Sequence, residues 1–570
     1  MYNTGDTETI IDEPSADYKS PERRNSQHTN TDSQGLGVSE KEGAGASDQA
    51  QDPQEATDKR EDSTGASEPI TPKRSSSNAV NFIFEWAAVL ICVSSMLFTQ
   101  VGIGAYLVIT KEFIAATFNI EGNAGQQSWI IAAHSLTVGT FVLPAGRLGD
   151  MFGNKKILCI GFLWYSIWSM VTGLTVYTRS IIFFDVCRAL QGIAPALMLP
   201  NAAGIIGRTY PPGVKKAISF ALFGASAPNG FVFGALFSSL FAQSSVKAPV
   251  NGAEWAWSNF VLAIALVVMF CLAMWIIPAD GDRSEQKGLG FDYWGTLTAV
   301  SGLILFNFAW NQAAIVTWNN GYVCALLVVG VLLLGVFAWV ESRVAQPLLP
   351  LSVFRNVHNN LMLGCIVTGW STFSIWLFYS IRFIQDLRNV GTLETVSQIV
   401  PCSVTGCLAA SLSTILILKV GGSWVMIGAL FAFLTAICLV AFQPVDLTYW
   451  AMQFVAFVIA PFGMDMSFPA ASIIISDHLP REHQGLAGSL VNTLVNYSIA
   501  IALGIAATVE MNVNNGGRDT ESGIRGALYL GVGLAATGVI LALTNKMIEV
   551  VESRRSADPE SAREAGKALE

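Results

Sequence analysis

Long apolar stretches separated by short polar turns dominate this chain. From about residue 85 almost to the end, apolar runs of roughly 20 residues recur, and a helix of that length spans the hydrocarbon core of a bilayer. The pattern therefore predicts fourteen membrane helices. Their expected ranges are 85–109, 128–146, 157–177, 181–207, 215–241, 256–277, 293–313, 321–340, 359–382, 396–418, 423–442, 447–470, 484–510 and 524–545.

Composition supports an all-α polytopic membrane protein. Of the 570 residues, 52% are hydrophobic and only 13% are charged, with a mean hydropathy of +0.47. Soluble proteins carry about 25% charged residues. The nine cysteines lie in or beside apolar runs without Cys-x-x-Cys pairs or histidines at ligand spacing, so we expect neither disulfides nor a metal site. We also expect no nucleic-acid partner.

The two ends of the chain differ from the apolar middle. Residues 1–84 hold 16 acidic and 8 basic residues, so this segment carries -8 of the net charge of -9. Such a polar segment cannot bury enough apolar surface to offset its ordering entropy. We expect residues 1–84 to be a disordered tail and residues 546–570 to be a second tail.

The distribution of Lys and Arg predicts the orientation. An even number of spans puts both tails on one side of the membrane. Loops on that side carry 12 bases against 7 on the opposite side, and cytoplasmic loops carry the excess of bases. We therefore expect both termini in the cytoplasm.

The turn between the second and third predicted helices has an unusual composition. It reads GRLGDMFGNKK over residues 146–156. Glycines permit a tight turn and a close approach of helices, and an acid at a helix end can cap the next helix or pair with a base on a neighbour. The residues that we expect to matter are Gly146, Arg147, Leu148, Gly149, Asp150, Gly153, Lys155 and Lys156.

This turn resembles the signature of the major facilitator superfamily, which lies between the second and third helices of that family. The resemblance implies a cytoplasmic gate in which Asp150 engages the neighbouring bundle in the outward-facing state. Arg147, Lys155 and Lys156 are possible partners of Asp150. A basic turn that only fixes topology is the alternative.

Two further stretches are similar to motifs of the same family. Arg188 with Gln191 and Gly192 resembles the intramembrane arginine motif of the fourth helix, which is linked to proton transfer. The fifth helix resembles the antiporter motif that bends this helix in exporters. Its hinge candidates are Gly224, Pro228, Gly230 and Gly234. Proline removes a helical hydrogen bond and small residues let helices pack closely.

Fourteen spans resemble the drug:H⁺ antiporter branch of the family. That resemblance implies six-helix bundles at residues 85–277 and 358–545, with two inserted helices and their linkers at 278–357. The stretches NFAWNQA, at 307–313, and FAWVESRVAQPLLPLSVF, at 337–354, are similar to a fungal subgroup. That subgroup contains aminotriazole-resistance and borate exporters and related ammonium carriers.

Charged residues within the predicted spans are candidates for coupling transport to protons. A charge at the bilayer centre costs roughly 2.5–3.5 kcal/mol on insertion scales, so each should face a cavity or a partner. Asp185 and Arg188 lie on one helical face and could form an ion pair or a proton-linked site. His134 is either a packing residue or a proton switch. Asp465 lies between two prolines and could face either substrate or protons.

Other polar and aromatic residues mark the expected cavity or the membrane boundary. Many members of the branch carry an acid in the first helix where this chain has Gln100, which cannot exchange a proton, so a uniporter is also possible. The candidates to line a substrate cavity are Gln100, Asn201, Asn307 and Trp370. Glu85 and Glu510 are expected at the membrane boundary.

These observations predict a transporter and not an enzyme. No His-Glu-x-x-His, Gly-x-Ser-x-Gly or nucleotide-binding loop is present, and no cofactor is expected. The favoured function is proton-coupled export of a small toxic compound, drug or secondary metabolite by a monomer in the plasma membrane or the vacuolar membrane. The alternatives are a facilitator or exporter of boric acid or ammonium, and a transporter-like nutrient sensor.

Overall fold

The computed structural model describes residues 76–210, 213–244, 253–279, 290–344, 347–478 and 484–556. Most of the expected N-terminal tail lies outside this range. Within it, fourteen helices are long and apolar enough to cross a membrane, and no strand occurs in the described segments, so the predicted fold class is confirmed. The helices that cross are α1 Ser76–Leu107, α3 Ala124–Phe152, α4 Asn154–Leu174, α5 Ile181–Thr209, α6 Val214–Ala242, α7 Ala256–Ile276, α8 Tyr293–Val316, α9 Gly321–Glu341, α10 Val357–Arg382, α11 Thr392–Val420, α12 Gly422–Ala441, α13 Gln453–Asp477, α14 Gln484–Val513 and α15 Thr520–Ser556.

Short helical segments complete the described elements. They are the π-helices η1 Thr110–Ile114 and η5 Phe383–Leu387, the helix α2 Ala115–Phe118, and the 3₁₀ segments η2 Thr175–Tyr177 and η4 Leu351–Arg355.

Several predicted boundaries were wrong by more than a turn. Helix α3 continues through residues 147–152, which we had expected in the turn. Helix α1 begins at Ser76, within the expected tail, and α15 continues to Ser556, although the apolar pattern ends near residue 545. Charged residues extend α15, where Lys546 Nζ lies 3.1 Å from Glu549 Oε1, and such pairs support a helix without apolar residues. Helix α13 begins and ends later than the predicted 447–470.

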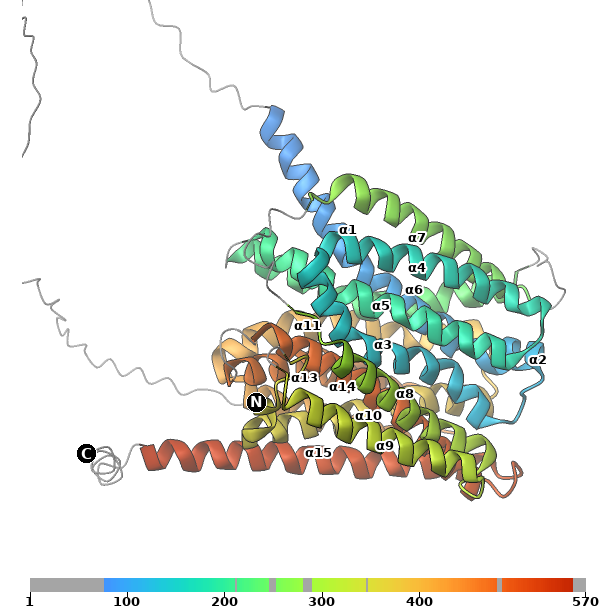
Figure 1. Ribbon diagram of the computed structural model, residues 1–570. Coiled ribbons are helices and arrows are strands. Elements are labelled where there is room, and N and C mark those ends of the chain that lie inside the picture. Colours follow the sequence, from blue (N-terminus) through green and yellow to red (C-terminus); the bar gives the residue numbers. More distant parts are fainter. Residues whose placement is uncertain are drawn as a thin grey trace, which may run out of the picture. The chain divides into compact units, whose positions relative to one another are not determined.

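The helices form two bundles and an additional hairpin (Figure 1). In the first, α1 packs on α6, α3 on α5, and α4 on α5 and α7. In the second, α10 packs on α14 and α15, α12 on α13 and α15, and α11 on α13. The two bundles meet along two seams, α3 with α14 and α6 with α11. The hairpin of α8 and α9 lies outside the first seam, where α8 contacts both α3 and α14.

Glycines set the close approach of α1 and α6. A Cβ at Gly234 would collide with the carbonyl of Val101, and a Cβ at Gly230 would collide with that of Leu97. Small residues let helix backbones approach in a membrane, where apolar side chains gain little by leaving lipid. Two of the four hinge candidates of α6 thus hold this helix against its own bundle.

Two helix connections consist of one glycine each. Gly153 joins α3 to α4 with φ of 112°, and Gly421 joins α11 to α12 with φ of 88°. Both amides bond back to the preceding helix, Gly153 N to Gly149 O and Gly421 N to Ile417 O. Positive φ is accessible to glycine at little cost, so the sequence ends one helix and starts the next within a single residue.

Side-chain caps begin several of the other helices. Asn123 accepts from Gln126 N at the start of α3, Ser180 from Phe183 N before α5, and Asp292 from Gly295 N before α8. At α15, Asp519 accepts from Ser522 N at 3.0 Å, and this bond lowers the pKa of the Asp519 carboxyl below its ordinary value. These side chains satisfy amides that have no partner within the helix.

The α1 and α6 contact predicts a position-specific cost of adding volume. Gly234→Val should lower the free energy of unfolding by about 1–3 kcal/mol, because the added methyl groups force the helix backbones apart. Gly335→Val in α9 is the matched control, since nothing lies within 4 Å of a Cβ built there. Unfolding by sodium dodecyl sulfate in mixed micelles measures both variants. Equal stabilities for the two would show that α1 and α6 are not tightly packed.

Candidate functional site

The glycine-rich motif of residues 146–156 lies where α3 ends and α4 begins. We call this end of the bundles the motif end and the opposite one the far end. Asp150 is exposed in the last turn of α3, while Arg147 and Leu148 are half-buried. Gly149 packs against the Asn201 side chain of α5, and a Cβ at Gly146 would lie 3.5 Å from Ser489 Oγ of α14. The turn therefore contacts both its own bundle and the opposite one.

The two lysines of the turn have different surroundings. Lys155 Nζ donates to Met274 O at 2.8 Å and to Ile277 O at 2.5 Å. These carbonyls end α7, and a cation there satisfies acceptors that have no partner within the helix and complements the helix dipole. Lys156 is exposed. Lys155 thus fastens the start of α4 to the end of α7, which the sequence did not predict.

The second seam brings the hinge candidates of α6 to α11. Helix α6 is continuous through Pro228. Pro228 faces Gly406, where an added Cβ would lie 2.7 Å from the proline ring, and Gly224 faces Ala410. Ser403 Oγ donates to Asn229 Oδ1 at 2.8 Å. The antiporter stretch is therefore divided, with Gly224 and Pro228 toward the opposite bundle and Gly230 and Gly234 toward α1.

Arg188 is fully buried in the centre of the first bundle. Its Nε donates to Ile130 O at 3.1 Å and its Nη1 to Gln191 Oε1 at 2.7 Å, while the guanidinium lies 3.9 Å from the ring centre of Tyr106. Gln191 in turn donates to Ser169 Oγ at 3.1 Å. Helices α1, α3, α4 and α5 thus share one polar cluster. It contains Arg188 and Gln191, the two polar residues of the arginine motif in α5. Gly192, the remaining residue of that motif, packs against the carbonyl of His134.

Asp185 and His134, the other two candidates for proton coupling in this bundle, lie near Arg188 but form no hydrogen bond or ion pair with its side chain. The ion pair between Asp185 and Arg188 does not form, because Arg188 bonds the groups above and Asp185 Oδ1 is buried without a hydrogen-bond partner. Asp185 lies in the second turn of α5, close to the far end. His134 is fully buried, and neither ring nitrogen has a partner within the described residues.

A buried carboxylate lies at the far end of the second bundle. Glu510 belongs to the last turn of α14 and is only 2% exposed. Arg382 Nη1 donates to both its oxygens, at 2.7 Å and 2.6 Å, and Tyr379 Oη donates at 3.0 Å. The guanidinium nitrogen, which contacts both carboxylate oxygens, and the neutral donor together satisfy a charge that would otherwise be costly to bury.

The same arginine connects this pair to the opposite bundle. Arg382 Nε lies 2.9 Å from Asp386 Oδ2, and Lys111 Nζ lies 2.9 Å from Asp386 Oδ1. We call Lys111, Asp386, Arg382 and Glu510 the far-end charge chain. Lys111 is in η1 and Asp386 is in η5, so the π-helices that follow α1 and α10 meet here.

Backbone and neutral groups strengthen the far-end contact. Lys111 Nζ donates to Gln385 O at 2.5 Å, and Gln385 Nε2 donates to Val108 O at 2.8 Å. Thr392 Oγ1 donates to Glu112. Sequence analysis missed these residues because their partners are more than 100 positions apart. The spacing of Arg382 and Asp386 by four residues was the one local signal.

The four cavity candidates have different positions. Asn201 and Asn307 are buried and do not line open space. Asn201 Nδ2 donates to Leu197 O within α5 at 2.7 Å and to Ala145 O of α3 at 3.3 Å, and Asn307 Oδ1 accepts from Asn311, which also donates to Ala500 O of α14. These asparagines pack helices together. Gln100 and Trp370 are half-buried, and Trp370 Nε1 donates to Ser467 Oγ at 3.2 Å.

Asp465 lies at the α6 and α11 seam. A Cβ at Gly406 would lie 3.1 Å from Asp465 Oδ2. That oxygen is buried without a hydrogen-bond partner among the described residues, although the residue as a whole is partly exposed.

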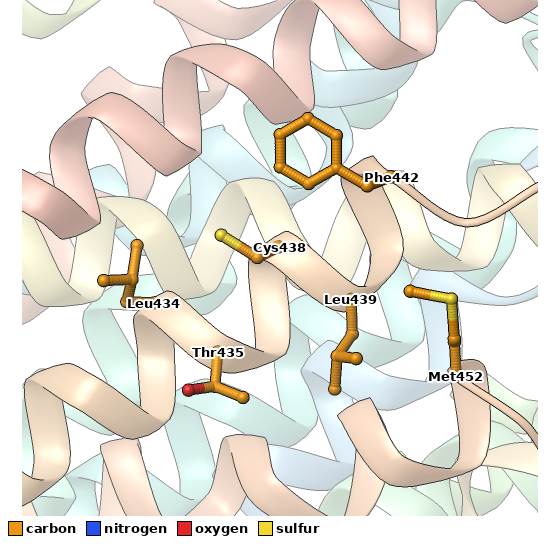
Figure 2. A pocket seen from close by; sticks show the side chains of 6 residues that line it. All are labelled: Leu434, Thr435, Cys438, Leu439, Phe442 and Met452. Atoms are coloured by element: carbon orange, nitrogen blue, oxygen red, sulfur yellow. The ribbon is translucent and has the colours of Figure 1, made fainter.

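A pocket on the second bundle differs from these sites in its chemistry. Figure 2 shows it along α12 and beside the start of α13, with Leu434, Thr435, Cys438, Leu439, Phe442 and Met452 around it. The Thr435 hydroxyl donates to Phe431 O at 2.8 Å, and none of the lining residues is charged. The pocket is lined mainly by apolar side chains, with the Thr435 hydroxyl and the Cys438 thiol as its polar groups.

The buried pair at the far end predicts a large loss of stability. Glu510→Ala leaves Arg382 buried with one fewer counter-ion, and breaking a buried pair costs about 3–5 kcal/mol. Glu521→Ala is the control, because Glu521 pairs with Arg525 at 2.8 Å but its side chain is 48% exposed, and exposed pairs contribute less than about 1 kcal/mol. Unfolding by sodium dodecyl sulfate compares the two. A loss for Glu510→Ala as small as that of the control would contradict the role of the pair.

Comparisons with known proteins assign the family. The model of the Major Facilitator Superfamily matches residues 90–505 and 361–565. The chain is 45% identical over 480 residues to the "Low affinity ammonium transporter" of Saccharomyces cerevisiae, covering 83% of this chain and 91% of that protein. It is 37% identical to "Efflux pump terJ" of Aspergillus terreus, with 84% and 90% covered, and 37% identical to the "Aminotriazole resistance protein" of S. cerevisiae, with 83% and 86% covered. With its fourteen membrane-spanning helices and its two bundles, the chain belongs to the major facilitator superfamily of membrane transporters.

Proposed function

We propose that this transporter exports a small organic compound in exchange for protons by alternating access. The observation that carries the proposal is the contact between the bundles at two levels. The turn with Asp150 approaches α14 at the motif end, and Lys111 pairs with Asp386 at the far end. A carrier that opens to one side at a time must break one set of contacts and keep the other. Two relatives, one named as an efflux pump and one as an aminotriazole resistance protein, support export.

The proposal assigns a role to each candidate group. The motif residues from Gly146 to Lys156 form the gate at the cytoplasmic side, and both termini lie in the cytoplasm. Proton coupling uses Asp185, Arg188, His134 or Asp465. The protein works as a monomer in the plasma membrane, and an exporter into the vacuole would serve the same detoxification. A proton that moves through about 100 mV gains roughly 2.3 kcal/mol and one pH unit adds about 1.4 kcal/mol, which supports a solute ratio of roughly several hundredfold.

A second function is favoured by one observation. The ammonium transporter of S. cerevisiae is more similar to this chain, at 45% identity, than the efflux proteins are at 37%. Facilitated movement of ammonium or of another small inorganic solute is therefore the alternative. A transporter-like sensor would show no flux of any solute.

Efflux from cells that express the wild type, Asp150→Asn or Asp185→Asn tests the proposal. The cells are loaded with aminotriazole, borate or an apolar toxin, with and without a protonophore. We expect wild-type efflux to collapse with the protonophore, and both variants to lose at least about tenfold in rate. Bidirectional flux that the protonophore does not change would identify a facilitator and overturn the antiporter proposal.

The ion pair between Lys111 and Asp386, in the far-end charge chain, predicts a smaller effect on the efflux rate than the Asp150 and Asp185 variants. Lys111→Met removes the charge that joins the bundles, while Arg382 still holds Asp386. Lys111 has a 40% exposed side chain, and an exposed pair contributes about 0.2–1 kcal/mol, so the closed far end should be destabilised by up to about fivefold. We expect a comparable fall in the efflux rate with an unchanged unfolding midpoint. Arg518→Met, an exposed base at the same end, should have no effect; equal rates for both variants would show that the bridge does not contribute.

A further inference from the structure

Asp465 of α13 is a carboxylate within the membrane region that has no counter-ion. None of the ion pairs formed among the described residues includes it, and its Oδ2 has no hydrogen-bond partner there. Glu510, a buried acid of the same bundle, is bonded to Arg382 and Tyr379. The fold therefore provides partners for Glu510 and leaves Asp465 with acceptor capacity.

Backbone carbonyls near Asp465 are further hydrogen-bond acceptors beside its carboxylate. Proline has no N–H and cannot donate to the carbonyl four residues earlier in a helix. Pro461 thus leaves Phe457 O without this bond, and Cys402 Sγ donates to that oxygen instead at 3.1 Å. Pro469 has the same effect on the carbonyl of Asp465 itself. One residue consequently presents a carboxylate and a main-chain oxygen that lacks its usual helical donor, and such freed carbonyls line cavities and bind cations in membrane carriers.

The position of Asp465 places it beside the seam between the bundles. Its Oδ2 lies next to Gly406, which faces Pro228 of the first bundle. Asn229 follows that proline and is already bonded, through Nδ2 to Cys407 Sγ at 3.0 Å and through Oδ1 to Ser403. The neighbouring polar groups of the seam are thus paired across it, while the carboxylate is not.

We propose that Asp465 binds the positively charged nitrogen of the transported compound, a protonated amine or ammonium. This inference rests on the proposed transport function and names its substrate class. A cation that carries N–H groups supplies the counter-charge for the carboxylate and hydrogen-bond donors for the backbone oxygen. Hydrogen bonds from a charged donor are stronger than those from a neutral one. A neutral solute such as boric acid gains no ion pair, and an anion is repelled.

Exchange across liposomes that contain the purified full-length protein tests this assignment. Equal pH and equal unlabelled substrate on both sides remove the need for proton coupling, so the assay reports substrate binding and translocation. The cationic probes are labelled methylammonium and ethidium, and the uncharged probes are aminotriazole and boric acid. The variants are Asp465→Asn and Asp465→Glu, with Asp446→Asn as the control because Asp446 is exposed in the connection before α13.

We expect Asp465→Asn to slow exchange of the cations by at least about tenfold and to leave uncharged probes within about twofold. Asp465→Glu should retain most cation exchange. Equal losses for charged and uncharged probes, with a lowered unfolding midpoint, would show a structural role and overturn the inference. The inference would also be overturned if Asp465→Asn exchanged every probe normally and lost only transport driven by a proton gradient. That result would identify Asp465 as a proton carrier.

The wild type separates the two hypotheses. A protein that exchanges the uncharged probes but no cation overturns the inference and leaves the proposed transport function standing. A protein that moves none of the probes, with or without a proton gradient, contradicts both.

Discussion

Hydrocarbon offers no hydrogen-bond partner, and this constraint determines how the chain is arranged. Backbone amides and carbonyls that face lipid must be satisfied inside the protein, so the described spans are continuous helices even where α3, α5, α6, α11 and α13 contain proline. Charges are restricted in the same way. Buried Arg188 contacts a carbonyl, an amide and an aromatic ring, and buried Glu510 accepts from Arg382 and Tyr379. Each polar cluster therefore identifies a place where several helices are held together.

The two bundles repeat the same backbone with different side chains. Helices α1 and α10 are each followed by a π-helix, and α3 and α11 each end at one glycine with positive φ. The sequence repeats as well, since PNAAGIIGRTYP from Pro200 and PAASIIISDHLP from Pro469 share prolines eleven positions apart. Related halves are a known feature of such carriers. In this alignment Asp465 corresponds to Ala196, so its carboxylate belongs to one half alone.

Sequence patterns predicted the helices well because the membrane requires long apolar runs. The motif stretch was identified because its glycines and charges are contiguous, although α3 continues through it to Phe152 and only Gly153 separates α3 from α4. The remaining parts depend on contacts between distant segments. The partner of Glu510 is Arg382 of α10, and Asn201 of α5 donates to the carbonyl of Ala145 in α3. Helix α15 extends past its apolar part because charge pairs support it. No periodicity of hydrophobic residues carries this information.

The one-residue connections at Gly153 and Gly421 have a mechanical consequence. A linker of one residue has no slack, so α3 cannot slide or tilt far without carrying α4 along, and α11 cannot move far without α12. Helices α3 and α11 each line a seam, whereas α4 and α12 pack on outer helices, α7 and α15. A displacement of α3 or α11 at its seam therefore also moves the helix that follows it, at the periphery of the bundle. The two helices of each hairpin move as one unit because a single glycine connects them.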